Sequence, residues 1–251
     1  VSLEEQQLRN GFEKVFMGAA GSAGGGGLDI TDLFSTYLYA GDGTNGRQIN
    51  NGIDLSGEGG MVWFKARTTG QNHRMFDTER GSDYSMTPNA TSRQSDHGST
   101  GLNSFDNDGF TLGAAVANGS GIYGGDYASW TWRKAPKYFD IVTYTGSGSA
   151  KTVAHSLGSA PGMIIIKNRD VTDPWAVYHR ANTAAPQTDY LVLNTTAATV
   201  DSAAWWNDTA PTSSVFTVGT DHSVNANGEN YVAYLFAHND GDGGFGPDGD
   251  Q

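Results

Sequence analysis

Two acidic residues near position 80 are the first candidates for chemistry. Asp77 and Glu79 flank a threonine and are followed by Arg80. A pair of carboxylates about 5 Å apart can act as nucleophile and general acid in a retaining glycosidase. Residues two apart on a strand only share a face, however, and nothing in the sequence sets that separation. We therefore interpret the pair as structural, and we predict no catalytic residue and no enzymatic activity.

The histidines offer a second possible base. His155 and His179 both lie within recurring sequence blocks, and neither is near a serine in a nucleophile-elbow motif. We expect both to make core or turn hydrogen bonds. Cysteine is absent, so a thiolate nucleophile, a disulfide and a zinc–thiolate site are all excluded.

An acidic, glycine-rich segment over residues 239–251 is the best candidate for a metal site. Asp240, Asp242, Asp248 and Asp250 supply oxygen ligands of the kind that Ca²⁺ accepts. The segment lacks the ligand series and the terminal glutamate of an EF-hand loop. We therefore interpret it as a solvated linker, and we predict neither a bound metal nor a cofactor.

Aromatic residues with nearby amides make glycan binding a more credible activity. Sugars stack their apolar faces on aromatic rings, while side-chain amides and carboxylates bond the hydroxyl groups. Trp205 and Trp206 lie between strand-like blocks, and adjacent residues of an extended segment point to opposite faces. One indole should therefore reach solvent or a partner, and we predict ligand contact at Trp205, Trp206 and Asn207. We expect core packing for the tryptophans inside strand blocks: Trp63, Trp130, Trp132 and Trp175.

The composition favours many short strands joined by tight turns. The 251 residues include 35 glycines and 28 aromatic side chains (11 Tyr, 11 Phe and 6 Trp), and only 17% are charged. A formal charge of −12 argues against a nucleic-acid partner, which requires clustered Lys and Arg. No apolar run approaches the roughly 20 residues of a membrane-spanning helix, and no secretory signal pattern opens the sequence. We predict a soluble protein without membrane insertion.

The N-terminal segment differs from the rest of the chain. Ser2 and Glu5 have the spacing of a capping box, and large apolar residues recur around them at roughly helical intervals. We predict a short helix over residues 1–17 and a flexible glycine-rich linker over residues 18–27. The helix either packs on its own domain or serves docking and oligomerisation. Because it lacks obvious partners, we expect the chain to form a homo-oligomer.

Internal similarity is the strongest signal in the sequence. Blocks recur in the same order, with paired blocks about 102 to 106 positions apart. Gly60–Arg67, for example, matches Gly162–Arg169. The pattern predicts a duplicated unit, with one copy in residues 28–137 and the other in residues 138–238, and the copies should superpose strand for strand. Further matched blocks begin at Phe34 and Phe139, Met75 and Val177, Asp83 and Asp189, Gly109 and Val215, and Tyr127 and Tyr231.

Each copy is typical of a β-rich module. Met61–Phe64 and Met163–Ile166 are continuous apolar runs, as expected for central strands that are covered on both faces. Asn-Gly turns such as Asn118-Gly119 and Asn227-Gly228 separate further strand-like segments. We predict an all-β protein of two tandem β-sandwich modules of jelly-roll or lectin-like type. The pattern leaves open whether each copy closes its own sandwich or the two share one.

The second copy carries a set of motifs that resembles a known group of proteins. These motifs lie in Tyr144 to Gly148, His155 to Lys167, Trp175 to His179, Leu191 to Asn194, Phe216 to Gly219, Asn225 to Gly228, and Tyr231 to Ala237. They resemble repeats in tail fibres and related virion proteins of tailed phages, especially those of marine cyanobacteria. The first copy departs from the pattern, since it lacks a counterpart of Pro161 and has Asp77 in place of His179. Its segment Gly60 to Gly81 is similar to the concanavalin-A-like lectin sandwiches of the same fibres.

This resemblance covers about nine tenths of the chain and implies a structural role in a virion. The expected protein is an extracellular-facing module of a tail fibre or spike that acts in host-surface attachment or fibre assembly, with glycan binding as one activity. Other virion proteins and a host-surface glycan are its expected partners. The alternatives are a polysaccharide-degrading tail enzyme and a free lectin-like binding protein, because a fold alone does not fix function. Within the resemblance, residues 239–251 would lead into another repeat.

Overall fold

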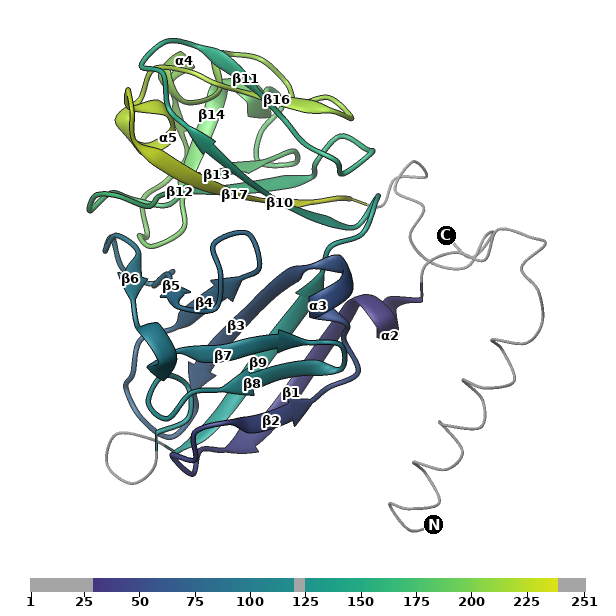
Figure 1. Cartoon of the computed structure of the whole chain (residues 1–251). Coiled ribbons are helices and arrows are strands. Elements are labelled where there is room, and N and C mark those ends of the chain that lie inside the picture. Colours follow the sequence, from purple (N-terminus) through teal and green to yellow (C-terminus); the bar gives the residue numbers. More distant parts are fainter. Residues whose placement is uncertain (1–28, 120–124, 239–251) are drawn as a thin grey trace, which may run out of the picture.

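Antiparallel strands make up most of this protein. The computed structural model describes residues 29–119 and 125–238, and Figure 1 shows them as two β-rich halves joined near residue 138. The all-β prediction is confirmed, because the few helices in the described ranges are short. The helix predicted for 1–17, the linker predicted for 18–27 and the acidic segment 239–251 lie outside the described residues.

The first half, residues 29–137, contains two main sheets. One has the strand order β1-β9-β3-β4, and the other has the order β2-β8-β7. A minor sheet pairs β5 with β6. The bounds are α2 Ile30–Leu33, β1 Phe34–Ala40, β2 Arg47–Asn50, α3 Leu55–Glu58, β3 Gly60–Ala66, β4 Arg74–Asp77, β5 Tyr84–Ser85, β6 Ser95–Asp96, η1 Gly98–Thr100, β7 Leu102–Asp106, β8 Gly109–Leu112 and β9 Asp126–Arg133.

The second half, residues 138–238, has a larger sheet in the order β10-β17-β12-β13-β14-β15 and a two-stranded sheet of β11 and β16. Two short helices, α4 and α5, flank the smaller sheet (Figure 1). The bounds are β10 Phe139–Thr145, β11 Lys151–Ala154, β12 Met163–Asn168, β13 Ala176–His179, η3 Pro186–Thr188, β14 Asp189–Val192, β15 Val200–Asp201, α4 Ala203–Trp206, β16 Val215–Val218, α5 His222–Asn225 and β17 Asn230–Phe236.

The central strands of the two halves pair in the same way. β3 lies between β9 and β4, and β12 lies between β17 and β13. Met61 of β3 is paired with Trp132 and Asp77, while Met163 of β12 is paired with Phe236 and His179. These partners occupy matching places in the recurring sequence blocks. The strand order β1-β9-β3-β4 therefore corresponds, strand for strand, to β10-β17-β12-β13.

A buried asparagine at the end of each half makes the same set of hydrogen bonds. The side-chain amide of Asn118 donates to the carbonyl oxygens of Thr44 and Gly113, at 2.8 and 2.9 Å. The amide of Asn225 donates to two carbonyl oxygens at matching places, those of Ser149 and Gly219. Each asparagine thus ties a loop after the first strand to the end of β8 or β16.

Side chains of the central strands point alternately to the two faces of each sheet, and this alternation divides the interior into three cores. On β3, Val62 and Phe64 face a core that is shared with β2, β7 and β8, while Met61 faces the second half. On β12, Ile164 and Ile166 face a core that is shared with β11, β16, α4 and α5. This division follows from the two-residue period of a strand. Both strands are covered on both faces, as their continuous apolar runs predict.

The third core lies between the two halves and contains a buried ionic group. The Asp77 carboxylate accepts hydrogen bonds from Arg80 Nε at 2.6 Å and from the Tyr234 hydroxyl of β17 at 2.6 Å. Both charged side chains are 0% exposed. Burial lowers the pKa of Arg80, but Asp77 and Tyr234 outweigh this effect and raise it. Trp175 adds a second link by donating its indole N–H to Thr87 O and Ala90 O.

Removal of the Asp77 carboxylate should loosen this junction. Asp77→Ala leaves the Arg80 guanidinium buried without a counter-charge, which should lower the free energy of unfolding by about 3–5 kcal/mol. Tyr234→Phe removes one donor and should cost about 1–3 kcal/mol. The measurement is urea unfolding of each variant against the parent protein.

Glu79→Ala provides the matched control, since it removes a carboxylate from the exposed Glu79–Lys134 pair. That change should cost less than about 1 kcal/mol. Equal destabilisation by Asp77→Ala and Glu79→Ala would contradict a structural role for the buried group.

Candidate functional site

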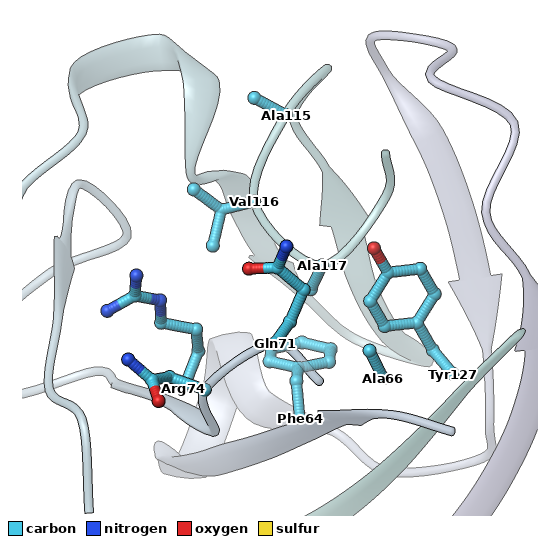
Figure 2. A pocket seen from close by; sticks show the side chains of 9 residues that line it. Phe64, Ala66, Gln71, Arg74, Ala115, Val116, Ala117 and Tyr127 are labelled. Atoms are coloured by element: carbon cyan, nitrogen blue, oxygen red, sulfur yellow. The ribbon is translucent and has the colours of Figure 1, made fainter. Parts of the chain in front are cut away.

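A small cavity opens at the end of the first half, beside the segment that follows β8. Its volume is about 170 Å³. Figure 2 shows its side chains converging from β3, β4, β9 and the 113–119 segment. The lining residues are Phe64, Ala66, Gln71, Asn72, Arg74, Ala115, Val116, Ala117 and Tyr127.

Aromatic packing fixes one side of the cavity. Phe64 is buried and meets Phe76 and Phe110 edge to face, with centroids 6.0 and 5.2 Å apart. Tyr127 stacks on Tyr39 at 5.4 Å with an interplanar angle of 15°. These contacts hold two rings in fixed positions, so the cavity has a rigid apolar wall.

Hydrogen-bond donors line the opposite side, where Figure 2 places the guanidinium of Arg74 across from Tyr127. Arg74 Nη1 bonds Thr87 Oγ1, and within residues 29–119 and 125–238 no carboxylate forms an ion pair with Arg74. Desolvation of this half-buried group lowers its pKa, yet an arginine stays protonated at neutral pH. Asn72 accepts a hydrogen bond from Asn89, which orients its amide.

The corresponding place in the second half carries polar side chains that bond one another. The pairing of β12 with β17 puts Asn168 opposite Tyr231, just as β3 and β9 put Ala66 opposite Tyr127. Asn168 Nδ2 donates to the Tyr231 hydroxyl at 3.1 Å, and it also bonds the Glu229 carboxylate. Where the first half has the methyl group of Ala66, the second half therefore has a hydrogen-bonded amide.

An acidic residue extends this filled network. Asp173 occupies the place of Gln71 along the chain, and its carboxylate bonds His222 Nδ1 at 2.7 Å and Ser223 Oγ at 3.0 Å. The Tyr231 hydroxyl donates to the His222 carbonyl at 2.6 Å. The polar groups of the second half thus satisfy one another, whereas those of the first half face a cavity.

The prediction of an exposed indole at Trp205 or Trp206 is wrong. The two residues lie in helix α4, not in an extended segment, and they are 6% and 2% exposed. Trp205 stacks on Tyr190, and the Trp206 indole N–H donates to Asp189 O at 3.0 Å. Because the two residues lie in a helical turn, both rings can face the core. The proposed ligand contact at these residues and Asn207 stays a prediction, without the exposed ring that motivated it.

Asn207 has a local structural explanation. Its φ of 53° and ψ of 36° place it in the left-handed region at the end of α4, where its N–H bonds the Ala203 carbonyl. Asparagine tolerates this conformation better than most residues, so it suits a helix terminus.

The candidate catalytic residues make structural contacts, as the sequence predicts. His155 Nε2 lies 3.2 Å from Thr212 O, and His179 Nδ1 accepts from the backbone N–H of Ala181 at 3.3 Å. Asp77 is buried against Arg80, whereas Glu79 pairs with Lys134 at 2.5 Å. In the parts of the chain that the structure describes, no group of three or more histidine and acidic side chains could hold a metal ion, and no helix is long and apolar enough to cross a membrane.

No single sequence motif marks this cavity. Arg74 and Gln71 belong to no motif, and Ala66 has no chemistry of its own. Alignment of the two halves does reveal the difference between them, because Ala66 aligns with Asn168 and Gln71 aligns with Asp173.

Trp206→Ala should behave as a core substitution. Loss of a buried indole and of its hydrogen bond to Asp189 should lower the free energy of unfolding by about 3–5 kcal/mol. Asn207→Gly, at the neighbouring left-handed position, should change it by less than about 0.5 kcal/mol, because glycine adopts this conformation freely. Chemical denaturation distinguishes the two, and a stable Trp206→Ala variant would mean that this ring does not belong to the core.

The pKa of His222 should lie above its ordinary value. The hydrogen bond with Asp173 is the largest cause and outweighs the opposing effect of burial, and the charge of Glu229 raises the pKa further. NMR titration of Asp173→Asn should therefore give a lower His222 pKa than in the parent protein. The raised folded-state pKa contributes stability that is fully present below about pH 6.5 and is lost as pH rises through the folded pKa. An unchanged pKa in the variant would rule out this pair.

Comparison with known proteins gives one family and no further relatives. The model of a family described as a domain of unknown function, DUF7483, matches residues 29–247. Neither a curated protein nor a solved structure matches the chain. Because the match spans most of its length, the chain belongs to the DUF7483 family.

Proposed function

We propose that this chain is a duplicated β-sandwich module of a phage tail fibre or spike, which acts in host-surface attachment or fibre assembly. In this proposal it binds a host-surface glycan in the cavity of its first half. It faces outward from the virion and works without catalysis.

The duplication is supported by contacts that recur between the halves. Tyr39 stacks on Tyr127, and Tyr144 stacks on Tyr231 with nearly the same geometry, 5.1 Å and 14°. The hydroxyls of Tyr39 and Tyr144 both donate to a carbonyl of the segment before the buried asparagine, each at 2.6 Å. The recurrence of such specific side-chain contacts supports descent of both halves from one unit.

The sandwich arrangement is supported by where the cores lie. Each half has a core between its larger sheet and its smaller one, and the third core joins the outer faces of the two larger sheets. This position of the cores supports a sandwich that each copy closes on its own. The halves are also joined by packing and by hydrogen bonds such as that of Tyr234 with Asp77, which suits a component that must transmit force.

The open cavity is the single observation that carries the binding role. The same scaffold fills this place with Asn168 in the second half and leaves it open with Ala66 in the first. Stability alone does not require an alanine here, because the second half has a hydrogen-bonded asparagine at the matching place. A rigid apolar wall faced by a few polar groups is the usual make-up of a small-ligand site.

Assembly with further copies or with other virion proteins is supported by the free edge of β1. Among the described residues this strand pairs only with β9, and it leaves Tyr37 and Leu38 37% and 56% exposed. An exposed strand edge with apolar side chains is a ready surface for protein contact.

Glycan binding can be tested with the full chain on an array of purified bacterial surface polysaccharides. We expect saturable binding without release of oligosaccharides. Ala66→Asn, which copies Asn168 into the first half, should fill the cavity and abolish binding, whereas the smaller change Ala66→Ser should retain it. Thermal unfolding should show that both variants fold.

Each alternative has its own signature in this experiment. Release of oligosaccharides would replace the attachment role with a degrading enzyme. Absence of binding, together with tight self-association, would leave only the structural role. Binding that Ala66→Asn does not affect would place the glycan elsewhere.

A further inference from the structure

Arg74 gives the cavity a chemical preference beyond its shape. It is the only charged residue among those that line the cavity. Its Nη1 atom bonds Thr87 Oγ1. The Nε and Nη2 atoms of Arg74 make no hydrogen bond to any residue that the structure describes. A guanidinium presents its donors as a planar fork that matches an oxyanion, and such charge-assisted bonds are roughly twice as strong as neutral ones.

The surroundings of Arg74 are cationic, although the whole chain carries a formal charge of −12. Lys65 Nζ bonds the carbonyl oxygens of Ala66 and Gln71 at the same end of the first half. After the effect of burial, the charge of Lys65 lowers the pKa of His73. The charge of Arg74 likewise lowers the pKa of His97, and it does so more strongly than the adjacent Asp96 raises it. This local excess of positive charge favours an anionic ligand over a cationic one.

The scaffold itself does not require this cation. The pairing of β3 with β4 puts Phe64 opposite Arg74, and the pairing of β12 with β13 puts Ile166 opposite Ala176. Ala176 is fully buried in the core of the second half. The charge is therefore present only in the half where the cavity is open. A half-buried charge is costly unless it is paired, and an oxyanion in the cavity would pair it.

The volume limits the size of the ligand. About 170 Å³ is well below the roughly 300 Å³ at which drug-sized pockets begin, so the cavity suits one ring-sized unit. Phe64 and Val116 offer apolar contact to such a ring, while the amides of Gln71 and Asn72 can reach its hydroxyl groups.

We infer that the cavity of the first half binds one acidic saccharide unit, with its oxyanion paired to Arg74 and its ring against Phe64 and Val116. The inference rests on the proposed function, since it names the class of glycan that the attachment site selects. A carboxylate and a phosphate ester offer Arg74 the same oxyanion chemistry.

Binding of small saccharides to the full chain tests this inference. The probes are D-glucuronate, D-glucose 6-phosphate, D-glucose and inorganic phosphate, followed by NMR shifts of Gln71, Asn72 and Val116 and by isothermal titration. We expect at least one acidic sugar to bind about tenfold more tightly than glucose or phosphate. The comparison of glucuronate with the phosphate ester identifies the preferred oxyanion.

Two variants show whether Arg74 makes the selection. Arg74→Gln should abolish the preference over glucose, and Arg74→Lys should retain part of it, because a lysine keeps the charge but not the fork. Arg93→Gln is the matched control, since it makes the same charge change at an exposed residue away from the cavity, and it should leave the preference intact. Thermal unfolding should be nearly the same for all three variants.

The inference is overturned if glucose binds as tightly as both acidic sugars, if phosphate alone binds as tightly as they do, or if Arg74→Gln leaves the preference unchanged. None of these results affects the proposed function when the array shows polysaccharide binding that Ala66→Asn abolishes. Conversely, binding of acidic sugars through Arg74 without any binding of polysaccharides would refute the attachment role. The proposed site for acidic saccharides would then still hold.

Discussion

The buried Asp77 carboxylate is the constraint on which the arrangement of this protein depends. A charge with no exposure must be paired, so Arg80 and Tyr234 have to lie within hydrogen-bond distance of it. Tyr234 belongs to β17 of the second half, and its position therefore fixes how the two halves meet. The aligned residue of the second half, His179, is exposed and therefore needs no buried partner. Asp77 thus provides a buried link between the halves that the aligned His179 does not.

Differences in side chains between the two halves also explain the candidate site. Stacked tyrosines and a buried asparagine hold the same framework in both halves. On that framework, the second half closes its end with hydrogen bonds among its own side chains, while the first half keeps an alanine and an arginine around a cavity. The two halves thus share a framework and differ in the side chains at its end.

Much of the fold could be predicted from the sequence, because burial on both faces leaves continuous apolar runs and tight turns leave Asn-Gly pairs. The environment of Trp205 and Trp206 could not, since a four-residue helix is too short to show a helical period. The role of Asp77 was equally hidden, because its partner Tyr234 lies more than 150 positions away. The cavity depends on the small side chain of Ala66. The significance of that small residue can be recognised only by comparison with the aligned Asn168.

A crystal structure of the full chain with a bound uronic-acid oligosaccharide would test the central claim most directly, namely that the first copy alone retains an open ligand site. We predict electron density for one sugar unit between Phe64 and Arg74, with the carboxylate on the guanidinium, and no sugar beside Asn168. Sugar bound at the second half, or a first-half cavity that stays empty while sugar binds elsewhere, would contradict the account.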